Sequence, residues 1–171
     1  MTYKVPPEPA AKRVAFWRRL KAMGAVYLQN GVCLLPQTDE HMRQLKMLEN
    51  DATEMGGEAF LLVTTSLDKA QEDKVIARFK ADRDSHYQEF LGKCDAFTAE
   101  ISREIAKEKF NFAELEEEDS ELKKLQAWLG RISALDFYHA PLSGTAREAL
   151  TQCEAALADY AQRVFDANGG Q

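Results

Sequence analysis

The chain has 171 residues, of which 45% are apolar, and its net charge is −6. This length accommodates one ordinary domain, or one small domain with a helical extension. No apolar run approaches the roughly 18 residues of a membrane span, and the N-terminus lacks the layout of a signal peptide. We therefore expect a cytoplasmic protein with no membrane partner.

The charge is unevenly distributed. Residues 1–50 contain eight Lys and Arg against four Asp and Glu, whereas the remaining residues contain fourteen against twenty-four. The first part is therefore +4 and the rest −10. A basic N-terminal part indicates where an anionic partner would bind.

The first predicted strand is short, because only Thr2–Val5 precede the prolines that begin at Pro6. Strands usually have five or six residues, so the sequence leaves open whether this strand is complete. A helix follows from Ala10 to Met23, and Gly24 is expected to end it in a left-handed conformation. The side chains expected on its sheet-facing side are Phe16, Trp17, Leu20 and Met23.

A β-hairpin is the clearest local signal, since Val26–Gln29 and Val32–Leu35 are joined by Asn30-Gly31. This pair predicts a type I′ turn, in which both central residues have positive φ.

A second helix, capped by Thr38 or Asp39, follows and ends at Gly56-Gly57, before a buried strand over Ala59–Thr64. Its expected buried face consists of His41, Leu45, Leu48, Ala52 and Met55. The order β-α-β-β-α-β over residues 1–66 predicts a ferredoxin-like plait, with the first strand inside the sheet.

Residues 67–171 are predicted to be helical. Apolar residues recur at helical spacing from Ile76 to Ile105, as one long helix or as two that break near Gly92. Two further stripes run over Leu115–Leu135 and Leu150–Val164, and Asn168-Gly169-Gly170 ends the last helix. An antiparallel bundle of three or four helices buries these stripes most simply. The fold class is therefore α+β, and mainly helical.

Two stretches resemble the N-terminal region of ChrB proteins, regulators of chromate resistance. They read PPEPAAKRVAFWRRLKAMGAVYLQNGVCLLP (Pro6–Pro36) and FAELEEEDSELKKLQAWLGRI (Phe112–Ile132). The resemblance implies a part in transcriptional control of a chromate efflux operon. Family members often carry a further C-terminal region associated with chromate sensing, which we expect this chain to lack. The expected role is then binding of DNA or of a partner.

The first helix is the candidate DNA-binding element. Each of its cations can neutralise one backbone phosphate. Four such contacts give only weak binding, so we expect a homodimer. The simplest alternative is a solvated helix face, and the rival function is a protein-interaction module that binds a partner protein through the bundle. The predicted DNA-binding residues are Lys12, Arg18, Arg19 and Lys21.

Arg13 differs from these four because its helical angle places it with Phe16, Trp17 and Leu20. It is expected to pass the sheet edge or to pair with a carboxylate. If an oxyanion such as chromate binds this part of the chain, Arg13 near the helix N-terminus is the candidate contact.

No pattern indicates catalysis. The acidic run Glu114–Glu121 lacks the glycine of a calcium loop, and the histidines show no metal-binding spacing. There is no nucleophile elbow, P-loop or dinucleotide fingerprint. The three cysteines form no CxxC pair and are expected to be buried thiols. We expect no enzyme activity, metal or cofactor.

Overall fold

The computed structural model describes residues 1–169; Gly170, predicted to help end the last helix, lies outside them. The chain divides into two compact units, Met1–Phe79 and a second from Lys80 onward, while the division predicted at residues 66 and 67 stays a prediction. The elements are β1 (Thr2–Lys4), α1 (Ala10–Ala22), β2 (Val26–Gln29), β3 (Val32–Leu34), α2 (Asp39–Glu54), β4 (Glu58–Phe60), α3 (Lys69–Ala106), α4 (Phe112–Ala134) and α5 (Ser143–Asn168).

The four strands form one sheet in the order β2-β3-β1-β4, and every neighbouring pair is antiparallel. This confirms the predicted plait, including the interior position of β1. Side chains of α1, α2 and the sheet form one apolar core, with Leu20 and Leu48 fully buried in it. Thr38 caps α2 by accepting a hydrogen bond from the His41 backbone N–H.

Trp17 departs from the predicted buried face of α1. Phe16, Leu20 and Met23 are buried as expected, but the Trp17 residue is 48% exposed. Trp17 lies on the flank of the apolar stripe, and the strands beneath α1 are only three or four residues long. We attribute its exposure to this short sheet, which does not extend beneath that flank.

The hairpin between β2 and β3 forms, but its turn is not type I′. Gly31 has a φ of +74°, whereas Asn30 does not have positive φ. The pairing is irregular between Tyr27 and Gln29. Such an irregularity increases the local strand twist, which a type I′ turn would otherwise provide.

The last strand is shorter than predicted, since β4 ends at Phe60 and not at Thr64. Phe60 pairs with Thr2, the first residue of β1, so β1 offers no further partner along the ladder. Leu62 and Val63 are consequently exposed.

β1 approaches both neighbouring segments through glycines. A Cβ atom added to Gly57 would lie 2.4 Å from the Lys4 carbonyl oxygen, and one added to Gly31 would lie 2.4 Å from the Tyr3 carbonyl oxygen. Backbone atoms cannot yield as a flexible side chain does, so both positions require glycine.

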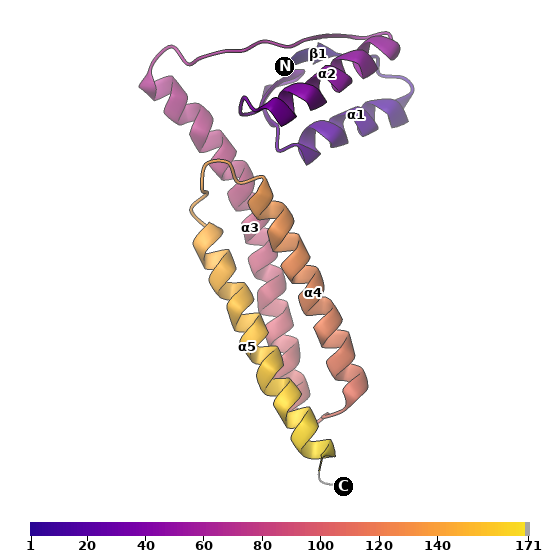
Figure 1. Cartoon of the computed structure of the whole chain (residues 1–171), viewed down its shortest axis with the longest axis vertical. Coiled ribbons are helices and arrows are strands. Elements are labelled where there is room, and N and C mark those ends of the chain that lie inside the picture. The colour runs from indigo at the N-terminus through magenta and orange to yellow at the C-terminus, as the bar shows by residue number, and fades with distance from the viewer. Residues whose placement is uncertain (170–171) are drawn as a thin grey trace. The chain divides into compact units, whose positions relative to one another are not determined.

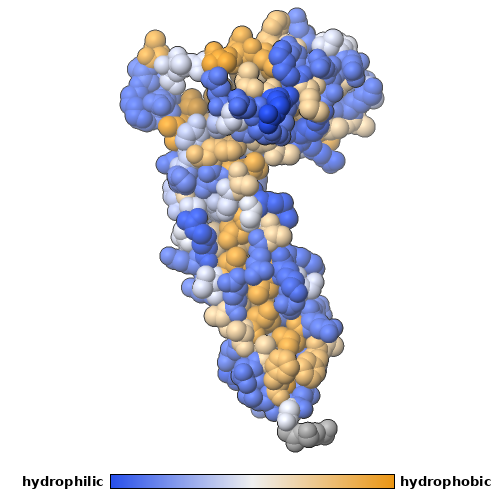
Figure 2. Space-filling model, in the orientation of Figure 1, coloured by the Kyte–Doolittle hydropathy of each residue, from blue (hydrophilic) through white to orange (hydrophobic). Residues whose placement is uncertain are grey.

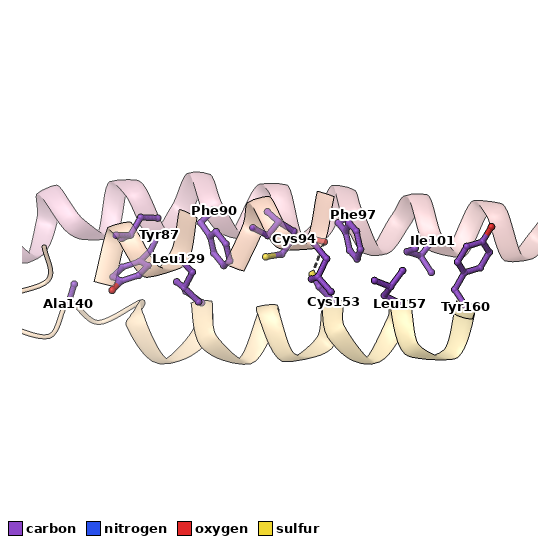
Figure 3. Packing of buried hydrophobic residues seen from close by; sticks show 14 of the residues in the cluster. Tyr87, Phe90, Cys94, Phe97, Ile101, Leu129, Ala140, Cys153, Leu157 and Tyr160 are labelled. Atoms are coloured by element: carbon purple, nitrogen blue, oxygen red, sulfur yellow. Dashed lines mark hydrogen bonds between the residues drawn. The ribbon is translucent and has the colours of Figure 1, made fainter. Parts of the chain in front are cut away.

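The second unit is a three-helix bundle of α4, α5 and the part of α3 from Lys80 onward, and these helices run side by side (Figure 1). α3 continues through Gly92 as one helix of 38 residues, which settles the question the sequence left open. Its stripe packs on both other helices: Figure 3 shows Phe90 beside Leu129 of α4, and Cys94 and Phe97 beside Cys153 of α5. No helix among residues 1–169 is long and apolar enough to cross a membrane.

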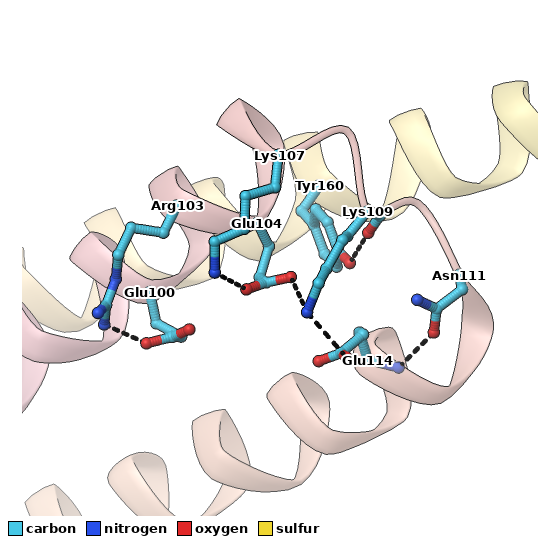
Figure 4. A network of polar contacts seen from close by, with 8 residues as sticks. All are labelled: Glu100, Arg103, Glu104, Lys107, Lys109, Asn111, Glu114 and Tyr160. Carbon is cyan, nitrogen blue, oxygen red and sulfur yellow. Dashed lines mark hydrogen bonds and ion pairs between the residues drawn. The ribbon is translucent and has the colours of Figure 1, made fainter.

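Polar side chains fix both connections of the bundle. Between α3 and α4, the buried Glu104 contacts Lys107 and Lys109 at 3.2 and 3.4 Å (Figure 4). Tyr160 of α5 donates a hydrogen bond to the Lys109 carbonyl at 2.6 Å. Between α4 and α5, Asp136 accepts a hydrogen bond from the Tyr87 hydroxyl of α3 at 3.1 Å, and the Leu142 N–H donates to Asp84 of α3 at 2.9 Å. Each loop is therefore tied to the helix that it does not connect.

Replacing Gly57 by alanine should destabilise the sheet unit by about 1–3 kcal/mol, because the new methyl group overlaps backbone of β1. Gly92→Ala is the matched control: nothing lies within 4 Å of its added Cβ, and alanine favours a helix by about 1 kcal/mol. Urea unfolding, followed by the separate NMR signals of Trp17 and Trp128, measures the two units independently. Equal stability of Gly57→Ala and the parent chain would contradict this packing.

Candidate functional site

α1 concentrates positive charge on one element. It contains five Lys and Arg and no Asp or Glu, in the sequence AAKRVAFWRRLKA. Four of the five cationic residues are exposed and Lys21 is half-buried. The helix is held by its buried side chains, Phe16 and Leu20, so the cations are presented by a fixed backbone.

One flank of α1 faces α2. Arg19 forms an ion pair with Asp51 of α2, and Lys12 lines the same cleft of about 230 Å³ together with Asp51 and Glu54. Part of the positive charge on this side is therefore compensated within the unit.

The structure divides the predicted DNA-binding residues between two sides of α1. Lys12 and Arg19 lie on the side of the α2 cleft, whereas the helical angles place Arg18 and Lys21 toward the opposite side. Lys12 and Arg18 form no ion pair with any residue among 1–169. The DNA-binding role of the four residues stays a prediction.

Arg13 does not pair with a carboxylate. It is exposed and lines a pocket of about 670 Å³ with Lys4, Trp17, Tyr3 and Tyr27. Sequence reasoning singled out Arg13 but missed this pocket, because its walls come from β1, α1 and the β2–β3 hairpin. The sequence nevertheless contains one indication of the pocket, namely two tyrosines in strands that the plait brings to the same side of the sheet.

The two tyrosines form a hydrogen-bonded pair, with 2.9 Å between their hydroxyl oxygens. Burial raises the pKa of both Tyr3 and Tyr27, although Arg13 opposes this rise at Tyr3. Both hydroxyls therefore stay protonated at neutral pH. Each hydroxyl carries one proton, and the hydrogen bond between the two tyrosines uses only one of them. The other O–H can therefore donate to a ligand.

The acidic run of α4 is mostly a solvated helix face. Asp119 pairs with Lys123 at 2.5 Å and Glu121 with Lys124 at 2.5 Å. Glu118 is the exception: it is only 7% exposed, and no hydrogen bond or ion pair joins its carboxyl to any residue among 1–169. Burial, followed by the nearby carboxylates of Glu100 and Glu117, raises the pKa of Glu118 to about 7.

The cysteines are buried, as the sequence predicts. Burial raises the pKa of all three thiols, that of Cys94 to about 12. Thiols of this kind are poor nucleophiles at neutral pH. Within the described part of the chain, no three His, Cys, Asp or Glu side chains are grouped so as to hold a metal ion.

The fold and the candidate site together define an α+β plait with a cationic first helix, followed by a three-helix bundle. The model of the family described as "Protein ChrB, N-terminal" matches residues 13–171. The chain therefore belongs to the ChrB N-terminal family, which confirms the resemblance seen in the sequence.

A curated relative, Protein ChrB of Cupriavidus metallidurans (strain ATCC 43123 / DSM 2839 / NBRC 102507 / CH34), is 29% identical over 102 residues. The match covers 60% of this chain and 31% of the relative, so it spans about a third of the relative's length. No solved structure matches the chain.

Glu118 should make the bundle less stable as the pH rises from about 5 to 8. Its pKa is raised on folding, so its stabilising contribution is complete below the ordinary value of 4.5 and is lost as the pH passes about 7. Glu118→Gln removes this loss and should raise the free energy of unfolding at pH 8 by about 2 kcal/mol. The exposed Glu116→Gln changes the charge equally, and Glu116 is not among the carboxylates that raise the pKa of Glu118, so it is the control. Parallel pH profiles of unfolding for the two variants would contradict a buried, raised-pKa carboxyl.

Proposed function

We propose that this chain is the DNA-binding part of a chromate-resistance regulator, and that it acts without catalysis. The observation that supports this proposal most directly is the charge of α1, which has five cations and no acidic residue in a chain of net charge −6. The resemblance to ChrB regulators supports the chromate connection. Buried, high-pKa thiols in place of reactive ones support the non-enzymatic role.

The phosphate contacts come from the cations of α1 that no carboxylate neutralises. Lys12, Arg13 and Arg18 are exposed and form no ion pair among residues 1–169. Arg19 contributes less than the sequence predicted, because Asp51 already pairs with it. Three or four phosphate contacts give weak, salt-sensitive binding. A homodimer on DNA doubles the number of contacts and gives useful affinity.

The surface is tested by reversing single charges of α1. Arg18→Glu should weaken binding to the upstream duplex of its own operon by about tenfold and lower the slope of log affinity against log salt by about 1 or more. Arg43→Glu, an exposed arginine of α2, is the matched control and should bind as the parent chain does. Fluorescence anisotropy at about 50 and 200 mM salt measures both quantities.

A scrambled duplex separates sequence-specific from general attraction in the same titration. Equal affinities of Arg18→Glu and Arg43→Glu for the native duplex would remove α1 as the contact surface. Absence of binding by the parent chain to either duplex would reject the proposed function itself.

A groove in the bundle favours a second function, protein interaction. It lies between α4 and α5, has a volume of about 410 Å³, and is lined by Leu115, Leu157 and alanines with Glu116, Asp119 and Glu154 among its walls. Figure 2 shows apolar residues following the length of the bundle between hydrophilic flanks. The acidic rim fits a partner helix with an apolar stripe and basic flanks, and disfavours a second copy of the same groove.

This alternative predicts that a labelled amphipathic peptide of leucine and lysine binds the groove, and that a peptide with glutamate in place of lysine does not. Ala158→Arg, which puts a long cation into the groove, should abolish binding of the lysine peptide, and Gln162→Arg on the exposed face of α5 should not. Anisotropy measures the affinities. Equal binding to both variants would show that attraction to the peptide does not involve the groove.

A further inference from the structure

The sheet has an open edge at β4. This strand is the outermost one on the side of β1, and the segment that follows it, residues 61–67, forms no backbone hydrogen bond with any residue among 1–169. A row of unpaired N–H and C=O groups at a sheet edge is a template on which another strand can pair.

This edge also lacks the residues that usually prevent strands from pairing. Proteins protect an exposed edge with charged side chains, with proline or with a bulge. Residues 59–67 read AFLLVTTSL and include neither a charged residue nor a proline, whereas 29% of the whole chain is charged. Phe60, Leu62 and Val63 are 52%, 61% and 63% exposed. The edge is therefore both apolar and unprotected.

The register of the sheet determines which backbone groups point outward. The Tyr3 N–H donates to a carbonyl of the β2–β3 hairpin, so the next residue, Thr2, bonds toward β4, where it pairs with Phe60. Backbone groups alternate in direction along a strand. The N–H and C=O groups of Leu61 and Val63 therefore face the free edge when the strand continues in extended form.

The side chains support such a continuation. Ala59 is buried in the core beneath the helices, and Leu61 packs against the same core, as the alternation of a strand requires. Phe60 and Leu62 then lie on the opposite face of the sheet, and both are exposed there.

A second copy of the edge matches these features. In an antiparallel pair with a two-fold axis at Leu61, the outward backbone groups of one copy meet those of the other. Phe60 of each copy then lies opposite Leu62 of its partner, and such aromatic–aliphatic pairs across strands are stabilising. Residues 59–67 bring no charge against the same residues of the partner.

The exposed apolar area fits a weak dimer. Fully burying one large apolar side chain removes on the order of 100 Å² from water, and the three exposed ones named above are each only partly available. Their sum is well below the roughly 800 Å² that each partner of a stable interface buries. We expect monomer and dimer to be in equilibrium, and a ligand that holds two copies together strengthens the dimer.

We propose that two copies of this chain pair their β4 edges antiparallel, with Leu61 at the two-fold axis, and so form one continuous sheet. A two-fold axis perpendicular to the sheet keeps α1 and α2 of both copies on the same face. The cations of both α1 helices are then presented on one side, as a homodimer on DNA requires. The use of this dimer in DNA binding rests on the proposed function, whereas its formation does not.

Sedimentation equilibrium of the full chain, without DNA, tests the surface. The parent chain should dimerise in the micromolar range. Leu62→Lys should weaken dimerisation about tenfold or more, because it removes the pair with Phe60 and puts like charges close to the axis. Met47→Lys is the matched control, since Met47 is 58% exposed but lies on α2. A parent chain that stays monomeric, or equal dimerisation of the two variants, would overturn the proposal.

Hydrogen exchange of the parent chain tests the strand pairing itself. The amides of Leu61 and Val63 should exchange about tenfold more slowly above the dissociation constant of the dimer than below it, because they face the partner. The amides of Leu62 and Thr64 should not change, since they point to the side of β1, whose pairing with β4 ends at Thr2. Equal protection of all four amides, or of none, excludes this pairing.

The remaining outcomes separate the dimer from other partners and from the proposed function. A monomeric chain that co-sediments with phosphatidylcholine vesicles makes the edge a membrane contact and rejects the second copy. Dimerisation with the expected effect of Leu62→Lys, but without duplex binding, supports the β4 pairing and rejects the role in DNA binding. Duplex binding by a strictly monomeric chain has the reverse meaning.

Discussion

β1 occupies the centre of the sheet although it is only three residues long, and much of the first unit follows from that constraint. Pro6 and Pro7 lie beyond it, and they lack the backbone N–H that a longer ladder needs. Because β1 can form only a few ladder hydrogen bonds, its place in the sheet also depends on close backbone contact with the neighbouring segments. Gly31 and Gly57 provide it, because a side chain at either position would meet the carbonyl oxygens of β1.

A narrow sheet cannot support the whole inner face of α1, and this gives the helix two different flanks. Toward α2, Arg19 finds Asp51 and the charges are partly compensated. On the flank that carries Arg13 and Trp17, the sheet ends early and leaves a cation and an indole beside the strand tyrosines. The pocket thus results from the same short strands that leave β1 with only a few paired residues.

The sequence allows the order of elements, the buried stripes and the caps of Thr38 and Gly24 to be predicted, because these depend on local periodicity and turn chemistry. The predictions that proved wrong depend on how far an element or its neighbours extend in the folded structure. The exposure of Trp17 and the end of β4 at Phe60 depend on how far neighbouring strands reach, which no local pattern encodes. Arg13 could be singled out by its helical angle, but the pocket around it combines three separate segments and required the fold.

Net charge is a poor guide to the partners of this chain. At about 0.1 M salt, exposed charges are screened over about 10 Å, so a ligand responds to its immediate surroundings and not to a total of −6. α1 places cations without acidic neighbours in its own sequence, whereas Glu116, Asp119 and Glu154 border the apolar groove of α4 and α5. The unpaired cations and the acidic groove rim therefore lie on separate elements of the chain. Local pairing also distinguishes the cations of α1 from one another, because Asp51 compensates the charge of Arg19 whereas Arg13 and Arg18 form no ion pair among residues 1–169.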